Sequence, residues 1–178
     1  MEMKKSFRVV ITDYNYPDLD IEKEILSQWG ASTEGFQCIS PDEVIEVGRE
    51  ADALIAQYVS ITIHVIKSLN KCKAIGRYGI GVDNIDVNAA TAKGIAVINV
   101  PSYCEEEVSD HALAMLLAWT RKVVHYTNEI RQGHWDWKSA RPIYRLQDKV
   151  LGLLGFGKIA RLLARKAQAV GLKVIAHD

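Results

Sequence analysis

Two glycines near the carboxyl end of the chain have the spacing of a dinucleotide-binding turn. Gly155 and Gly157, followed by Ala160, fit the pattern G-x-G-x-x-G/A. In this pattern the first glycine allows a tight turn and the second lets a pyrophosphate approach the backbone N–H groups at a helix start, while the small third residue allows close packing of helix and strand. Glycine-rich turns also occur where nothing binds, so the spacing alone leaves both interpretations open.

The residues on either side of this turn favour the dinucleotide interpretation. The apolar run Val150–Leu154 predicts a strand before the turn, and helical periodicity after it extends to Gly171. A second buried strand is predicted over Leu172–Ala176, with Asp178 at its carboxyl end. A carboxylate at that place can accept hydrogen bonds from both ribose hydroxyls. The sequence therefore predicts a βαβ unit that binds NAD.

A second glycine-rich stretch, G-R-Y-G-I-G-V-D-N-I-D, places Gly76, Gly79 and Gly81 around a predicted strand end. Closely spaced glycines can turn successive N–H groups toward one point, which suits a bound carboxylate. Spacing alone favours the plainer interpretation, an ordinary left-handed turn with Asp83 or Asn84 capping the next helix.

No histidine has the surroundings of a catalytic acid. His64, His111, His125 and His134 lie within or beside predicted helices and a loop, and none has a neighbouring carboxylate at a spacing that suggests a triad or a metal pair. Structural roles are favoured for them. We assign no catalytic residue and no metal ligand from the sequence.

Alternating short strands and helices must position these groups. Strands are predicted at Phe7–Ile11, Gly35–Ile39, Ala53–Ala56, Ala74–Arg77 and Ala96–Asn99, with helices near Ile21–Trp29, Asp42–Val47, Thr62–Leu69 and Ile85–Lys93. This alternation predicts an α/β fold with a parallel sheet covered on both faces, ending near Val100-Pro101. Ligands of such sheets bind at the carboxyl ends of the strands. The loops Thr12–Asp18, Gln57–Ser60 and Arg77–Asp83 follow strands there.

A long helix is predicted from about Ser102 to Tyr126. Ser102 and Glu105 have the spacing of a capping box, and apolar residues on both sides of the helix predict burial nearly all round. The segment 131–147 breaks the α/β rhythm and carries Trp135 and Trp137. These indoles need a covering surface, either a second subunit or their own domain, and the sequence does not decide between the two.

The composition is that of a globular protein of one large or two small domains. The 178 residues are 48% hydrophobic, and 22 basic residues balance 22 acidic ones. No basic track predicts nucleic-acid or membrane binding. Three widely spaced cysteines argue against a disulfide framework, and Met1–Lys5 is charged and lacks an apolar signal core. A cytoplasmic location is predicted.

Read together, the stretches G-R-Y-G-I-G-V-D-N-I-D, A-A-T-A-K-G-I-A-V-I-N-V-P, V-S-D-H-A-L-A-M-L-L-A and L-G-L-L-G-F-G-K-I-A resemble the D-isomer-specific 2-hydroxyacid dehydrogenases. The resemblance is densest over residues 74–178 and strongest to the phosphoglycerate-dehydrogenase group and the relatives of C-terminal-binding-protein corepressors. It implies a flavodoxin-like substrate domain, here residues 1–101, and the start of a Rossmann NAD-binding domain, here residues 102–178. It also implies a homodimer built mainly from the NAD domains.

The resemblance also implies site residues, and it reverses the preference for a plain turn at Gly79. The implied substrate-binding residues are Tyr58, Arg77, Gly79, Ile80 and Gly81, and the implied cofactor-binding residues are Val108, Gly155, Phe156, Gly157, Lys158, Ile159 and Asp178. The implied activity is NAD-dependent hydride transfer between a small D-2-hydroxy acid and its 2-keto acid. An NAD-gated protein-binding role of the corepressor kind shares every one of these motifs.

One departure from the family is severe. The family's catalytic Arg, Glu and His follow the second Rossmann strand, which is where the 178 residues stop. We therefore expect these residues to be the amino-terminal part of a longer enzyme and to be inactive alone, since a six-stranded Rossmann sheet needs more strands than the two predicted here.

Overall fold

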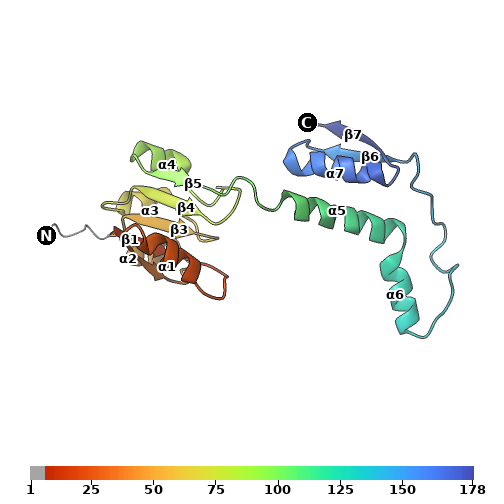
Figure 1. The fold of residues 1–178 in the computed structure, drawn as a ribbon, viewed down its shortest axis with the longest axis horizontal. Helices are drawn as coiled ribbons and strands as arrows, with labels where there is room; N and C mark the ends of the chain where they lie inside the picture. The colour runs from red at the N-terminus through yellow and green to blue at the C-terminus, as the bar shows by residue number, and fades with distance from the viewer. Residues whose placement is uncertain (1–6) are drawn as a thin grey trace. The chain divides into compact units, whose positions relative to one another are not determined.

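The computed structural model describes residues 7–178. The charged stretch Met1–Lys5, from which the absence of a signal core was predicted, lies outside the described residues. The chain divides into two compact units, Met1–Tyr103 and Cys104–Asp178 (Figure 1). Each unit is an α/β arrangement built on a parallel sheet, as the sequence predicts.

The first unit contains a five-stranded parallel sheet in the order β2-β1-β3-β4-β5. Its strands are β1 (Phe7–Ile11), β2 (Ala31–Gly35), β3 (Ala53–Ala56), β4 (Ala74–Arg77) and β5 (Ala96–Ile98), and its helices are α1 (Asp20–Ser27), α2 (Pro41–Gly48), α3 (Ile63–Ser68) and α4 (Val87–Ala92). In the register, Ile11 lies opposite Ile55 and Ala56 lies opposite Arg77. The carboxyl ends of β1, β3 and β4 are therefore neighbours, and the loops that follow them meet.

One apolar core holds this unit together. Val10, Leu54 and Ile75 from three adjacent strands are fully buried beside Val44 of α2 and Ile66 of α3. Helix α1 differs, because it has no buried residue. Its predicted apolar stripe is exposed, with Ile21 70%, Ile25 53% and, just beyond the helix, Trp29 78% accessible.

The second strand was predicted at the wrong place. Gly35–Ile39 was expected, but the strand is the more polar Ala31–Gly35, at the edge of the sheet. The apolar residues that suggested the later position follow the strand. There Phe36 N–H donates to Ile11 O at 2.9 Å and Cys38 N–H to Thr12 O at 2.8 Å, and both side chains pack on the core. The connection is apolar because these side chains pack on the core, whereas an edge strand need not be apolar. Hydrophobicity therefore predicted the strand at the position of the connection.

The second unit begins with two helices where one was predicted. They are α5 (Glu105–Thr120) and α6 (Val123–Arg131), separated at Lys122, whose φ of 58° is left-handed. The predicted capping box is also wrong, because Cys104 precedes α5 and provides no side-chain cap. Burial all round is wrong as well, since Ser109 is the one buried residue of α5 while Trp119 is 72% exposed.

The unit ends in a βαβ element formed by β6 (Val150–Leu154), α7 (Lys158–Ala169) and β7 (Lys173–His177). The strands pair in parallel from Val150 opposite Lys173 to Leu154 opposite His177. Strand β7 begins and ends one residue later than the predicted Leu172–Ala176. Leu172 is not part of the strand because its N–H donates to Ala167 O at 3.1 Å, and its burial explains why it was predicted as a strand residue. Helix α7 packs against α5, where Lys166 Nζ donates to Ser109 Oγ at 2.7 Å and pairs with Glu106 Oε2, also at 2.7 Å.

Candidate functional site: a glycine turn and a glycine-arginine loop

The turn between β6 and α7 has the backbone geometry that the glycine spacing predicts. Gly155 has a left-handed φ of 87°, and its N–H donates to His177 O at 2.7 Å. The next N–H, that of Phe156, donates to Asp178 Oδ1 at 3.0 Å. Gly157 occupies the N-cap position, and α7 begins at Lys158. The turn thus places Asp178 beside the start of the helix.

Gly157 has no structural reason within the described residues to be a glycine. Its φ of −69° is open to any residue, and a Cβ added there would meet no atom within 4 Å. The same open space surrounds an added Cβ at Gly155. Unpaired N–H groups and the positive end of the dipole at a helix start favour anions. The space and the dipole together suit a phosphate group close to the backbone.

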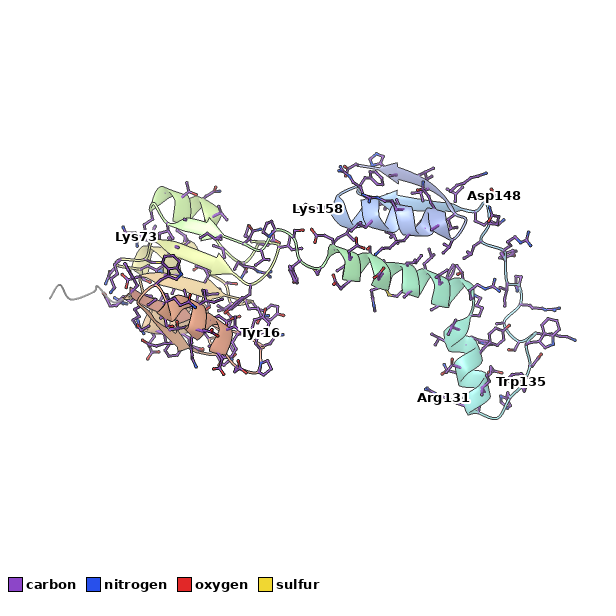
Figure 2. All side chains as sticks on the ribbon, in the orientation of Figure 1. Tyr16, Lys73, Arg131, Trp135, Asp148 and Lys158 are labelled. Atoms are coloured by element: carbon purple, nitrogen blue, oxygen red, sulfur yellow. The ribbon has the colours of Figure 1, made fainter. Side chains whose placement is uncertain are left out.

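Two cations flank this turn, and both have protein partners. Lys158, at the start of α7 (Figure 2), has its Nζ 3.7 Å from Glu105 Oε1 of α5. Arg161 Nε donates to Phe156 O at 2.8 Å, and its guanidinium lies 5.8 Å from the Phe156 ring centroid. The pair formed by Lys158 brings the starts of α5 and α7 together. Val108, on the first turn of α5, is 42% exposed.

In the first unit, the loop after β4 brings a guanidinium against a glycine. Gly79 has a φ of +152°, and a Cβ built on it would lie 1.4 Å from Arg77 Nη1. Arg77 Nε is buried without a hydrogen-bond partner within residues 7–178. Over the same residues, the N–H groups of Ile80 and Gly81 donate no hydrogen bond. The carbonyl oxygens of this loop do have partners, since Gly79 O accepts Val100 N–H at 3.0 Å and Ile80 O accepts Asn99 Nδ2 at 2.6 Å. The loop thus gathers a cation and free N–H donors, a set that suits a carboxylate.

The loop is held by its neighbours rather than by a helix cap. Asp83 and Asn84 were predicted as caps of the next helix, but Asp86 caps α4, accepting from Ala89 N–H at 2.9 Å. Asn84 Nδ2 instead donates to Val59 O at 3.0 Å and so ties this loop to the one after β3.

Tyr78, between Arg77 and Gly79, anchors the loop to α1. Its hydroxyl donates to Glu22 Oε1 at 2.8 Å, and its ring lies edge-on to Tyr16, with centroids 5.3 Å apart. Burial, followed by the hydrogen bond to Glu22, raises the pKa of Tyr78 well above its usual range. The raised pKa favours the protonated hydroxyl, which is the form that donates to Glu22.

The sequence analysis missed Asp13, which organises the loop carrying Tyr58. Asp13 lies two residues after the end of β1 and is 7% exposed, and its carboxylate accepts backbone N–H groups from the loop after β3. Tyr58 itself is 66% exposed. An acidic residue at the buried end of a strand was the available signal, since such a carboxylate needs partners.

The histidines have surface contacts. His125 Nε2 lies 2.9 Å from Ser139 Oγ, and His134 Nδ1 lies 3.8 Å from Glu129 Oε2, a carboxylate neighbour that sequence spacing did not indicate. His134 is 63% exposed, and the pair lies at the end of α6. Among the described residues no group of three His, Cys, Asp or Glu side chains could hold a metal ion. Nor does any helix within residues 7–178 have the length and apolar character needed to cross a membrane.

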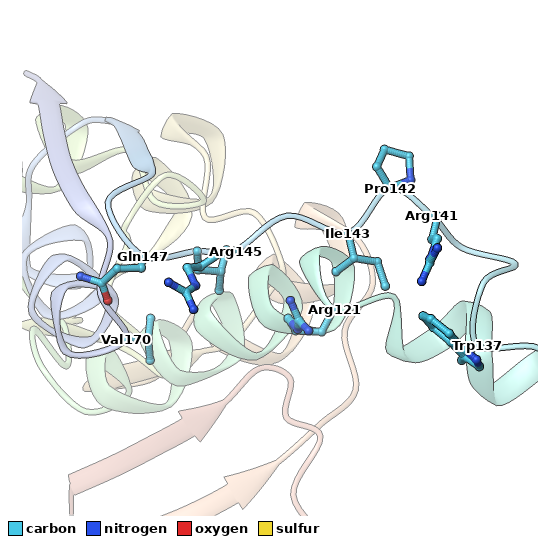
Figure 3. Close-up of a pocket in the computed structure, with 9 residues that line it drawn as sticks. Arg121, Trp137, Arg141, Pro142, Ile143, Arg145, Gln147 and Val170 are labelled. Carbon is cyan, nitrogen blue, oxygen red and sulfur yellow. The ribbon is translucent and has the colours of Figure 1, made fainter.

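The second unit also has a cavity of 980 Å³ away from the glycine turn (Figure 3). Arg121, Arg141 and Arg145 line it together with Trp137, and the Arg141 guanidinium stacks 4.1 Å from the Trp137 ring centroid. None of the predicted substrate or cofactor residues lines this cavity. Trp135 is 85% exposed on the segment after α6 (Figure 2), so packing within its own unit does not cover it.

Comparison with known proteins gives consistent results. Residues 9–176 match the family described as D-isomer specific 2-hydroxyacid dehydrogenase, catalytic domain. The chain is 37% identical to D-3-phosphoglycerate dehydrogenase of Methanocaldococcus jannaschii, over 79% of this chain and 27% of that protein. It is also 37% identical to hydroxypyruvate reductase of Thermotoga maritima, over 79% of this chain and 46% of that protein. It thus spans less than half the length of either relative.

Solved structures share the fold. An acyclic imino acid reductase, Bsp5, in complex with NADPH and D-Arg, matches with a TM-score of 0.83 and 27% identity, over 96% of this chain and 55% of that one. Cofactor (NAD+)-bound 3-phosphoglycerate dehydrogenase of Entamoeba histolytica matches with a TM-score of 0.75 and 26% identity, over 97% and 54%. With the family match over nearly its whole length, the chain belongs to the D-isomer specific 2-hydroxyacid dehydrogenase family.

Proposed function

We propose that the protein encoded by the complete gene interconverts a small D-2-hydroxy acid and its 2-keto acid with NAD. The observation that carries this proposal is Gly157, a glycine that the described fold does not require but that a pyrophosphate against the start of α7 would. The family and the relatives named as dehydrogenase and reductase support the same reaction. Bound NAD would supply the hydride acceptor, and the protein would supply binding and orientation.

The two units would divide the work, with residues 1–101 as the substrate domain and residues 102–178 as part of the NAD domain. Arg77 and the free N–H groups of Ile80 and Gly81 would bind the substrate carboxylate, and Tyr58 would contact the rest of the substrate. Gly155–Ile159 would hold the pyrophosphate of the cofactor. Asp178 would bind its adenosine ribose, and Val108 would lie near its nicotinamide. Three of these assignments are supported by a local geometry: the guanidinium over Gly79, the open turn and the adjacent carboxylate.

The direct test is turnover by the purified product of the complete gene. We expect NADH oxidation with at least one 2-keto acid among glyoxylate, pyruvate, hydroxypyruvate and phosphohydroxypyruvate. Cofactor binding without turnover of any of them would contradict the proposal and favour the protein-binding alternative. The cysteines Cys38, Cys72 and Cys104 are free thiols, which suits a reducing compartment, and we propose a cytoplasmic location.

We predict a preference for NAD over NADP that depends on the charge of Asp178. Its carboxylate would accept ribose hydroxyls but repel a 2′-phosphate. Asp178→Asn removes the charge and keeps an oxygen acceptor for Phe156 N–H, now 3.0 Å from Oδ1. The ratio of kcat/KM for NAD to that for NADP is expected to fall about tenfold, equivalent to about 1.4 kcal/mol. A wild-type ratio of one or less, or no change in the variant, would count against this role.

We predict that the protein is a two-fold dimer held partly by the segment after α6. Trp135 is 85% and Trp137 is 62% exposed, and a symmetric partner would cover both. Light scattering at micromolar concentration should give the mass of two chains, and Trp135→Ser with Trp137→Ser should raise the dimer dissociation constant at least about 100-fold. Trp29→Ser is the matched control, because Trp29 is 78% exposed on the first unit. A monomeric wild type would overturn the prediction.

A further inference from the structure

A single buried carboxylate shapes the loop that carries Tyr58. Asp13 Oδ1 accepts Gln57 N–H at 3.0 Å and the Thr12 hydroxyl at 2.9 Å. Its Oδ2 accepts Tyr58 N–H at 2.5 Å and Val59 N–H at 3.1 Å. Three consecutive backbone N–H groups therefore converge on one side chain from the loop that follows a different strand, β1. A carboxylate as buried as this one is tolerated only when its oxygens are satisfied, and here four donors satisfy them.

This contact begins where the strand pairing between β1 and β3 ends. The ladder reaches Ile11 opposite Ile55, and Thr12 N–H then donates to Ile55 O at 2.8 Å. Beyond that point β1 has ended, so the backbone of Gln57–Val59 has no residue of β1 to pair with. The Asp13 side chain takes over the hydrogen bonding and thereby sets the direction in which the loop leaves the sheet.

The orientation of Tyr58 follows from a second pair of contacts. Asn15 N–H donates to Gln57 Oε1, and Gln57 Nε2 donates to Asn15 Oδ1, both at 2.7 Å. These bonds orient the Asn15 amide so that its Nδ2 lies 3.5 Å from the Tyr58 hydroxyl. Asp13 thus fixes the backbone of Tyr58, and Asn15 contacts the hydroxyl group of its exposed ring.

The same segment is tied to the loop that holds the guanidinium. Tyr78 N–H donates to Ala56 O at 2.9 Å, just before the segment, and Asn84 Nδ2 donates to Val59 O at 3.0 Å, at its end. The conformation that Asp13 imposes on Gln57–Val59 is therefore coupled to the position of the loop containing Arg77 and Gly79. Tyr58 follows β3, and Arg77 is the last residue of the adjacent strand β4.

We propose that Asp13 is a positioning residue for the substrate, acting through Tyr58: it fixes the loop after β3 so that the tyrosine meets the substrate bound at Arg77. This inference rests on the proposed function, since it takes Tyr58 as a substrate contact. The residues proposed to bind the cofactor all lie in residues 102–178, so we expect the effect of Asp13 to be confined to the substrate.

The test is a double-mutant cycle in the product of the complete gene. Asp13→Asn replaces one acceptor by an NH₂ group that opposes the loop N–H donors, and we expect KM for the preferred 2-keto acid to rise at least about tenfold. The dissociation constant for NADH should change less than about twofold, since the residues proposed to bind it belong to the second unit. In a Tyr58→Ala background, Asp13→Asn should raise KM no further, because the side chain through which it acts is gone.

The control is Asp52→Asn, which also removes a carboxylate that accepts a backbone N–H, that of Arg8 at 2.8 Å, and pairs with Lys71 at 3.4 Å. It should lower the unfolding midpoint without changing KM. If Asp13→Asn does not fold, Thr12→Val serves in the same cycle, because it removes one donor to Asp13 and preserves the shape of the side chain.

Equal KM effects of Asp13→Asn with and without Tyr58 would overturn the inference, as would an unchanged KM. Absence of turnover in the wild type would instead refute the proposed function, so the two failures are distinguishable. If Asp52→Asn raised KM as much as Asp13→Asn does, the effect of Asp13 would be a general one on folding, and the inference would be overturned.

Discussion

Gly157→Ala is expected to weaken NADH binding about 100-fold while lowering the stability of the protein by less than about 1 kcal/mol. Gly157 has a φ of −69° and no atom within 4 Å of an added Cβ, so the methyl group strains nothing in the described fold. The change from glycine to alanine at an N-cap costs less than about 1 kcal/mol of stability. A pyrophosphate close to the backbone at this point would collide with the methyl group and lose charge-assisted hydrogen bonds, each contributing about 1.5–3 kcal/mol.

Gly152→Ala is the matched control. Gly152 lies in β6, five residues before Gly157, and an added Cβ there also meets no atom within 4 Å. Titration of NADH fluorescence with both variants, together with their thermal unfolding midpoints, separates binding from stability. We expect only Gly157→Ala to lose affinity. Equal affinity of the two variants would mean that no phosphate approaches the start of α7, and the cofactor assignment would fail.

The strands of this fold could be predicted closely where they are central. Phe7–Ile11, Ala53–Ala56 and Ala74–Arg77 have the predicted bounds, as does Val150–Leu154 in the second unit. The three in the first unit are flanked by neighbours in the sheet, so burial imposes an apolar run that ends where the strand ends. The edge strand Ala31–Gly35 was not predicted correctly, because it has a neighbour on one side only and needs no apolar run.

The break between α5 and α6 could not be predicted from periodicity. Apolar residues continue at helical spacing through Lys122, and neither glycine nor proline marks the change of direction. The left-handed conformation of Lys122 is accompanied by a contact of its Nζ with the Trp119 ring, 5.2 Å from the centroid. Residues three positions apart also make such contacts within a continuous helix, so this spacing gives no sign that the helix breaks here.

Local and distant contacts explain which parts of the candidate site were predictable. The glycine turn and the Arg77–Gly81 loop depend on residues close together in the sequence, so their patterns are visible there. Asp13 bonds to residues more than 40 positions away, and the bond between Gln57 N–H and its Oδ1 spans 44 positions. A single acidic residue at a strand end gives no indication of which loop it will hold.

Gly79→Ala is expected to lower kcat/KM for the 2-keto acid about 100-fold, with most of the change in KM. The φ of +152° is one that residues with a side chain rarely adopt, and the added Cβ would lie 1.4 Å from Arg77 Nη1. The obstructing atom is the end of a flexible side chain, so the guanidinium can move away and the fold need not open. Its displacement would remove a charged hydrogen-bond donor from the substrate carboxylate, a loss of about 1.5–3 kcal/mol, in addition to backbone strain of about 1–3 kcal/mol.

Gly94→Ala separates the strain from the displacement. Gly94 also has a left-handed φ, +72°, but an added Cβ there meets nothing within 4 Å, so this variant has the strain without the collision. We expect it to lower the unfolding midpoint and to leave KM unchanged. The decisive comparison uses Arg77→Ala, which removes the guanidinium outright. If Gly79→Ala acts by displacing that group, its effect on KM should nearly vanish in the Arg77→Ala background, since residues in contact are not additive. Additive effects of the two substitutions would show instead that Gly79 serves the substrate through its own backbone, and Ile80 N–H and Gly81 N–H would then be the groups that hold the carboxylate.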